Sequence, residues 1–356
     1  IVQYDQVDLY VEQTNPENPR QYLYQDDWLD METERESINV KGEGPVEVEL
    51  KFTRHGPIIW EDPKNHRVVA VRWVGMEPGT AGYLGSLAMD RVQDWDGFVA
   101  AMSRWKIPAE NIVYADIDGD IGWIPAGLMP IRDNWLGLLP IPGHTAEYEW
   151  TGFRTVDELP RVKNPAEHFV ATSNHNILPR DYPFDLGFDW TPPYRFLRVH
   201  EVLAQGRKFT IEDFKKLQHD ETSLPARRLI EMLRNLPTEG SEDFQTARQI
   251  LEEWDKVMAR DSQAAALYEV WQEETIVPEF VATQLPEEAR ELVAQNIELP
   301  TLFDLIDALP SGSRNQVLSR SLEKAFSRTK ELLGNDPKAW RWGSIHKAHF
   351  THPLAS

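Results

Sequence analysis

The stretch ATSNHNILPRDYPFDLGFDWTPPYRFLRVHEVL, residues 171–203, combines an expected strand end, a polar cluster and an expected helix start. Residues 168–171 have the pattern of a strand, and three amide or imidazole side chains follow, at Asn174, His175 and Asn176. A loop rich in proline and aromatic residues then leads to Arg195 and Arg198. The spacing raises the question of why a polar strand end precedes a pair of arginines.

Asn174 and Arg198 have the chemistry of a reaction site. A neutral amide can stabilise an oxyanion, because its dipole carries no charge that must be desolvated. An arginine has five fixed donors and keeps its proton, so it can orient such an amide. On the residues alone, an asparagine that caps a turn and an arginine on a solvated helix face are the preferred interpretation.

Length and composition limit the class of protein. The 356 residues suffice for one large or two ordinary domains, and 41% hydrophobic and 27% charged residues are typical of globular proteins. The net charge of −21 argues against nucleic acid and anionic membranes as partners. No apolar run is long enough to cross a bilayer, and the lack of cysteine excludes disulfides, thiolate metal sites and cysteine nucleophiles.

The pattern along the chain predicts an α+β fold. Strand patterns dominate the first two hundred residues, and NIVYADIDGDIGWIPAG predicts a hairpin around Asp118 and Gly119. Helical periodicity follows, as in SEDFQTARQILEEWDKVM, with expected N-caps at Thr210, Ser241 and Ser313. We therefore expect a β-rich portion over residues 1–205, a helical segment over 206–335, and a return toward the β-rich core over 336–356. Both chain ends are expected to be cuts in a longer protein.

Two histidine motifs favour structural roles. HKAHFTH spaces His346, His349 and His352 by three and lacks the spacing of zinc proteases. TRHGPIIW places Arg54 and His55 before a turn, and no G-x-S-x-G nucleophile motif accompanies them. DIDGDIG likewise departs from the EF-hand template, so a hairpin turn is the better interpretation.

Asp5 and Asp8 stand three apart in an otherwise apolar strand pattern. Such positions cost stability unless the carboxylates are paired, metal-bound or solvated. Half of a calcium site, with the Val7 carbonyl as a further ligand, and two solvated edge residues are equally compatible with the pattern.

A set of motifs in fixed order carries a family resemblance. The motifs are DLYVEQTNPENPRQYLY, TRHGPII, NIVYADIDGDIGWIPAG, LLPIPGHTAEYEWTG, ELPRVKNPAEHFVATSNHNILPRDYP, RFLRVHEVL and WRWGSIHKAHFTHPL. Together they resemble the penicillin acylase family of N-terminal-nucleophile hydrolases. The resemblance covers essentially all 356 residues and matches the middle of the family's β-chain.

The resemblance implies an αββα sandwich, here partial, with a large helical segment. It also implies a precursor that cuts itself into α- and β-chains, with an N-terminal serine as nucleophile. The serine's own α-amine is the base, and its pKa of about 7.7–8.0 suits that role near neutral pH. The α-chain would be a partner, the substrate a small-molecule amide, and the location periplasmic or secreted.

Site residues follow from the resemblance by position. Asn174 matches the oxyanion asparagine, with His175 in place of the family's second asparagine, and Arg198 matches the active-site arginine, with Arg195 as runner-up. The backbone N–H that completes the oxyanion hole falls at Ile1 or Val2. Calcium ligands match Asp5, the Val7 carbonyl, Asp8, Asp185 and the Gly137 carbonyl. Ser86 and Glu110 fall where a phenylacetyl-specific pocket has tryptophan and isoleucine, which argues against that specificity.

The resulting expectation is an N-acyl amide hydrolase acting on a β-lactam side chain or an acyl-homoserine lactone. Its serine would lie upstream of Ile1, so this chain alone is expected to be inactive. The alternative is a non-catalytic glycan-binding or scaffold protein of related fold, which the thirteen tryptophans suggest. A glycosidase using Glu110 and Asp116 is a third hypothesis.

Overall fold

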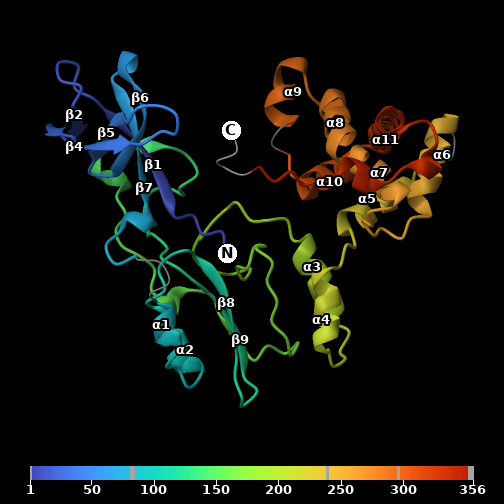
Figure 1. Cartoon of the computed structure of the whole chain (residues 1–356), viewed down its shortest axis with the longest axis horizontal. Helices are drawn as coiled ribbons and strands as arrows, with labels where there is room; N and C mark the ends of the chain where they lie inside the picture. Colours follow the sequence, from blue (N-terminus) through green and yellow to red (C-terminus); the bar gives the residue numbers. More distant parts are fainter. Residues whose placement is uncertain (1, 81–84, 238–239, 295–296, 352–356) are drawn as a thin grey trace. The chain divides into compact units, whose positions relative to one another are not determined.

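The computed structural model describes residues 2–80, 85–237, 240–294 and 297–351. It divides into two compact units, Ile1–Thr191 and Pro192–Ser356 (Figure 1). The first is rich in strands and the second is helical, so the predicted α+β class is confirmed. The division falls after Thr191 rather than after residue 205, because the helix that carries Arg198 packs with the second unit.

The described residues of the first unit form three sheets and two short α-helices. Its strands are β1 (Val7–Gln13), β2 (Gln21–Tyr24), β3 (Asp27–Asp30), β4 (Glu32–Ile38), β5 (Val46–Thr53), β6 (Gly56–Asp62), β7 (Arg67–Trp73), β8 (Glu110–Ala115), β9 (Ile121–Ala126), β10 (Ile141–Pro142) and β11 (Val162–Lys163). Its helices are η1 (Pro63–Asn65), η2 (Val74–Met76), α1 (Ser86–Met89), α2 (Trp95–Met102), η3 (Ala146–Tyr148) and η4 (Val156–Glu158).

The six-stranded sheet has the order β10-β1-β7-β6-β5-β4. β1 runs antiparallel to β7, with Val7 opposite Trp73 and Gln13 opposite Arg67, and parallel to β10. Side chains alternate between the two faces of a strand, so Asp8, Tyr10 and Glu12 all point to one face. All three are buried, which makes this face of β1 unusually polar for a sheet interior.

The expected hairpin around Gly119 is confirmed as β8 and β9. Gly119 has a φ of 93°, and Asp116 Oδ1 accepts hydrogen bonds from the backbone N–H groups of Asp118 and Asp120. Helix α2 begins at an Asp94 cap and packs Trp95 against this hairpin. A Cβ on Gly122 would overlap the Trp95 ring, so the close packing needs glycine there.

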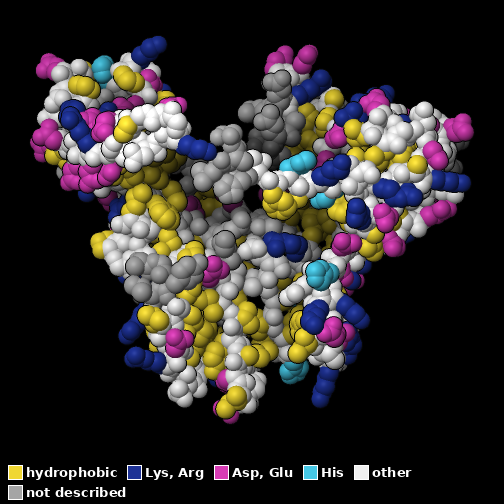
Figure 2. All heavy atoms as spheres, in the orientation of Figure 1, with side chains coloured by type: hydrophobic (Ala, Val, Ile, Leu, Met, Phe, Trp, Pro, Cys, Tyr) yellow, Lys and Arg dark blue, Asp and Glu magenta, His cyan; other side chains and the backbone are white. Residues whose placement is uncertain are grey.

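Acidic side chains gather over the ribbon of β4 and β5, as Figure 2 shows in magenta. Every residue of β4 is exposed, including Glu32, Glu34 and Glu36. The acidic side chains of β4 are thus placed on a solvated surface, as is usual for charge-rich strands.

The second unit is built from helices around one core. They are α3 (Tyr194–Leu203), α4 (Ile211–Gln218), α5 (Leu224–Arg234), α6 (Glu242–Glu252), α7 (Gln263–Val270), the π-helix η5 (Trp271–Thr275), α8 (Ile276–Gln284), α9 (Glu287–Ala294), α10 (Leu299–Ala308), α11 (Ser311–Leu333), η6 (Pro337–Ala339) and α12 (Trp342–Ile345). Trp271, Phe326 and Trp340 lie in the core. Trp340 is fully buried there, so residues just after 336 pack with the helices of this unit.

Two of the three predicted N-caps are confirmed, because their side chains accept hydrogen bonds from the first turn of the helix. Thr210 and Ser241 are N-caps that accept from the backbone N–H groups of Asp213 and Phe244. The prediction for Ser313 is wrong, because α11 already begins at Ser311, after Pro310.

No helix in the described parts of the chain is both long and apolar enough to span a bilayer. Tryptophans at 95, 105, 150, 254, 271 and 340 are buried in the core, whereas Trp28, Trp60 and Trp73 are exposed.

Candidate functional site

The segment before β1 is fixed against the loop that carries Asn174. Asp5 N–H donates to the Leu186 carbonyl at 2.8 Å, and Leu186 is fully buried in a cluster with Val2 and Tyr4. A Cβ on Gly187 would overlap the carbonyl of Gln3, so the two backbones lie in direct contact. The N-terminal segment and the 174–191 loop therefore form one packed site.

One N–H group joins Asn174 to this segment. The backbone N–H of Thr191 lies 3.1 Å from the Asn174 carbonyl and 2.7 Å from Gln3 Oε1. Gln3 is two residues from Ile1, the position at which the resemblance completes the oxyanion hole. The backbone at Asn174 is thereby held beside the start of the chain.

Asn174 has a left-handed backbone, with φ of 61°. Asparagine tolerates this conformation better than most residues, whereas a β-branched residue would be strained. Burial lowers the pKa of the neighbouring His175, so its imidazole is neutral at pH 7. The strand expected over residues 168–171 is absent from this described stretch, where His168 also has positive φ.

A cleft of about 560 Å³ runs along the N-terminal segment. Residues Val2–Val7 line one side, and Trp73, Leu138 and Phe188 present exposed apolar surface to it. Apolar walls with a few polar groups are typical of small-molecule sites. The cleft is therefore suited to a small-molecule ligand beside the Asn174 loop, whose Phe188 and Asp189 line it.

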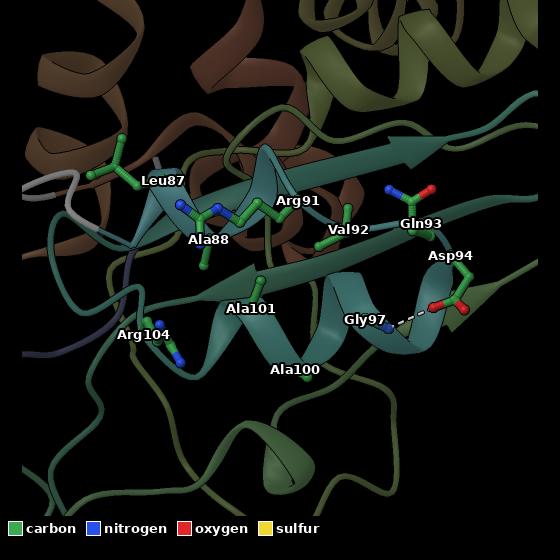
Figure 3. Close-up of a pocket in the computed structure, with 10 residues that line it drawn as sticks. All are labelled: Leu87, Ala88, Arg91, Val92, Gln93, Asp94, Gly97, Ala100, Ala101 and Arg104. Carbon is green, nitrogen blue, oxygen red and sulfur yellow. Dashed lines mark hydrogen bonds between the residues drawn. The ribbon is translucent and has the colours of Figure 1, made fainter.

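Neither residue expected in the substrate pocket lines this cleft. Glu110 begins β8 and follows Ala109, whose carbonyl accepts from Val2 N–H at 3.0 Å. Ser86 begins α1, and the next two residues of that helix, Leu87 and Ala88, line a different groove of about 760 Å³ between α1 and α2 (Figure 3). Arg91 and Arg104 line that groove.

The second N–H considered for the oxyanion hole is already engaged. Val2 N–H donates to Ala109, so it is not oriented toward a bound substrate in this structure. Ile1, the other position, lies outside the described residues.

Arg198 lies on α3 in the second unit, and its guanidinium is engaged there. Nε and Nη2 donate to the two carboxylate oxygens of Asp220, at 3.0 and 2.7 Å, and Nη1 donates to Glu201 at 2.9 Å. Arg195 is exposed on the same helix. A bidentate pair of this kind fixes a side chain firmly, so Arg198 in this state tethers α3 to Asp220.

Three of the five expected calcium ligands face an arginine instead. Arg132 Nε donates to Asp8 Oδ2 at 2.7 Å, and its Nη groups donate to the Asp5 carbonyl at 3.1 Å and the Val7 carbonyl at 3.5 Å. Asp185 is exposed. Among the described residues, no three His, Cys, Asp or Glu side chains gather as a metal site. The residues as arranged do not fit a bound calcium ion.

A buried ionic network on the same sheet was missed by the sequence analysis. His55 Nδ1 donates to Glu12 Oε1 at 2.7 Å, and Nε2 donates to Glu149 Oε1 at 3.1 Å. Arg54 and Arg72 pair with Glu149, and the ring of Tyr10 stacks on His55 at 3.8 Å. The preferred structural role of His55 is confirmed, since the side chain is buried. The alternation of Asp8, Tyr10 and Glu12 was the available signal.

The geometry contradicts the glycosidase hypothesis. Glu110 starts β8 and Asp116 follows its end, so about six extended residues separate them by roughly 20 Å, too far for paired glycosidase carboxylates.

His346 bonds Glu269 and stacks on Trp342, which confirms a packing role for this histidine. His352 lies outside the described residues.

Comparison with known proteins decides the family. The profile of the family described as Penicillin amidase matches residues 1–356. The chain belongs to the penicillin amidase family. The expected family resemblance is thus confirmed over the whole chain.

Two curated proteins illustrate the similarity in sequence. The chain is 29% identical to Penicillin acylase 2 proenzyme of Pseudomonas sp. (strain SE83), over 98% of this chain and 46% of that protein. It is 27% identical to Acyl-homoserine lactone acylase QuiP of Pseudomonas aeruginosa, over 96% of this chain and 45% of that protein. The chain spans about half the length of these relatives.

A solved structure shows the fold. Thermostable Penicillin G acylase from Alcaligenes faecalis matches with a TM-score of 0.76 at 20% identity, over 96% of this chain and 68% of that chain. The expected N-terminal-nucleophile hydrolase fold, with its added helical segment, is confirmed by this likeness.

Proposed function

We propose that this chain is part of an N-acyl amide hydrolase that transfers the acyl group through a serine ester. The observation that carries the proposal is the Thr191 N–H shared by the Asn174 carbonyl and Gln3, which holds the candidate oxyanion donor beside the start of the chain. The family membership supports the same reaction class.

In this proposal the nucleophile is an N-terminal serine of a longer protein, since this chain covers 46% and 45% of two of its relatives. Its oxygen attacks the amide carbonyl carbon, and its own α-amine takes the proton. The C–N bond then breaks, the amine leaves with a proton, and water hydrolyses the ester. The Asn174 amide and the Ile1 N–H stabilise the oxyanion in both steps.

The remaining family expectations belong to the same proposal. An α-chain released by self-cleavage of the precursor pairs with the chain that carries residues 1–356, and the protein acts in the periplasm or outside the cell. An arginine of α3, Arg198 or Arg195, orients the site. The cleft with Trp73, Leu138 and Phe188 is suited to an apolar acyl group.

The cleft and the relatives support a substrate class for this proposal. Relatives named penicillin acylase and acyl-homoserine lactone acylase both cover nearly the whole chain. We place an aliphatic or aromatic acyl amide, either a β-lactam side chain or an acyl-homoserine lactone, as the substrate.

The test uses the full-length protein with penicillin G and with N-acyl-homoserine lactones of increasing chain length. Mass spectrometry measures the free acid and the free amine, which must appear in equal amounts. Intact mass of the purified protein should resolve two chains, the larger beginning with serine. A single uncut chain that releases neither product would contradict the proposal.

A further inference from the structure

Arg132 is the cation that the N-terminal segment already holds. Its side chain is only 6% exposed, and it comes from the loop between β9 and β10. Its Nη groups both reach the Asp5 carbonyl at 3.1 Å, and Nη2 lies 3.6 Å from Asp5 Oδ1. One guanidinium therefore contacts three positions at which the family resemblance placed a calcium ligand.

Asp8 already accepts three hydrogen bonds through its carboxylate. Its side chain is 1% exposed. Besides Arg132, Trp150 Nε1 donates to Oδ2 at 2.6 Å and Trp135 Nε1 donates to Oδ1 at 3.1 Å. An indole nitrogen is a donor only, so these two contacts cannot be exchanged for a cation without moving the rings.

Arg132 occupies oxygen atoms that a calcium ion would need at this locus. The ion takes six to eight oxygen ligands at about 2.3–2.6 Å. Asp185 is exposed, the carbonyls of Asp5 and Val7 already accept from Arg132, and Gly137 packs directly against the Asp5 carboxylate and the Arg132 guanidinium. The Asp5 side chain keeps 23% exposure, so water can hydrate the charge that Arg132 does not balance.

We propose that Arg132 takes the place of a structural calcium ion in this protein, clamping the N-terminal segment to the β9–β10 loop. The clamp fixes Asp5 and Val7 through their carbonyls and Asp8 through its carboxylate. These residues lead directly back to Gln3, so Arg132 positions the start of the chain beside the Asn174 loop. The inference concerns binding and does not depend on the proposed reaction.

The first test measures calcium directly. Full-length protein is dialysed against EDTA and then against millimolar Ca²⁺, and bound calcium and Tm are recorded. The expected result is no calcium retained and no change in Tm. An ion that raises Tm in the wild type and is lost in Asp5→Asn would overturn the proposal. A rise that persists unchanged in Asp5→Asn places the ion elsewhere and supports it.

The second test measures how strongly Arg132 stabilises the N-terminal segment. Arg132→Ala should lower Tm by several degrees and speed hydrogen exchange at the Asp5 and Val7 amides, while Arg132→Lys, with its charge but not its fork, should fall between. Arg91→Ala is the matched control, because this exposed arginine makes no ion pair within the described residues. Equal behaviour of Arg132→Ala and Arg91→Ala would contradict the clamp. Should Arg132→Ala not fold, the calcium measurement on wild type still decides.

Discussion

Glu12 Oε1 lies 2.7 Å from His55 Nδ1, and neither side chain is more than 1% exposed. Because His55 also bonds Glu149 through Nε2, both ring nitrogens donate and the ring is an imidazolium. Burial disfavours the charged ring, but the hydrogen bonds to Glu12 and Glu149 outweigh it and raise the pKa of His55. The pair links β1 to the β5–β6 turn.

The network predicts a stability maximum in mildly acidic solution. The raised pKa of His55 means that its contribution is complete below its ordinary value of about 6.5 and is lost as pH rises through the folded-state value. Burial opposes ionisation of Glu149, but His55 and Arg54 hold its pKa at about 2, so its contribution is present above 4.5 and lost as pH falls toward 2. Urea unfolding at a series of pH values measures the fall in the free energy of unfolding on the acidic and on the alkaline side.

His55→Gln should abolish the fall in stability at alkaline pH. Near pH 6 it should lower the free energy of unfolding by about 3–5 kcal/mol, because it leaves Glu12 buried without its ion-pair partner. His66→Asn is the control, since His66 is exposed and asparagine tolerates its φ of 49°. A wild-type curve that is flat from pH 6 to 9 would rule out the charged ring.

Gly143 should resist substitution. A Cβ at this position would overlap the Glu12 carboxylate, which is fully buried and cannot swing to solvent. Gly143→Ala should therefore destabilise the protein by about 1–3 kcal/mol, as overpacking does. Gly44→Ala is the matched control, because a Cβ there meets nothing within 4 Å. Equal Tm values for the two variants would show that the carboxylate is not held as described.

Replacing each of the two arginines of α3 should distinguish an effect on stability from an effect on catalytic rate. Arg198→Ala breaks the bidentate pair with Asp220 and should lower Tm. If Arg198 also orients the site, its loss lowers kcat in the fraction that remains folded, whereas Arg195→Ala should leave kcat unchanged. Kinetics normalised to folded protein distinguish them, and a kcat loss confined to Arg195→Ala would move the role to that residue.

Local chemistry made much of the fold predictable. The Asp118-Gly119 turn specifies its hairpin, and Thr210 and Ser241 cap their helices with their own side chains. The helix expected to continue to Met258 stops at Glu252, and Lys256 adopts positive φ of 68°. Tertiary packing, with Trp254 buried in the helical core, overrides the periodicity there.

The site was predictable only in part, because its partners are distant in sequence. Asn174 was singled out by residue chemistry and family resemblance, and the structure places its loop beside Gln3. Arg132 lies 124 residues from Asp8, and Glu149 lies 94 from His55, so no spacing rule joins them. The sequence left Asp8 as a calcium ligand or a solvated edge residue, and the buried arginine that pairs with it could be identified only from the fold.

The central claim is that Asn174 stabilises the oxyanion of an acyl-transfer reaction. The direct measurement is kcat/KM of the full-length protein on its best N-acyl amide, for wild type, Asn174→Gly and Asn174→Asp. Both replacements tolerate the left-handed backbone, so they remove the amide while keeping the loop. The account predicts a loss of about 10²- to 10³-fold for Gly and at least as much for Asp, whose charge repels the oxyanion, with unchanged Tm. Wild-type kcat/KM in a folded Asn174→Gly protein would contradict it.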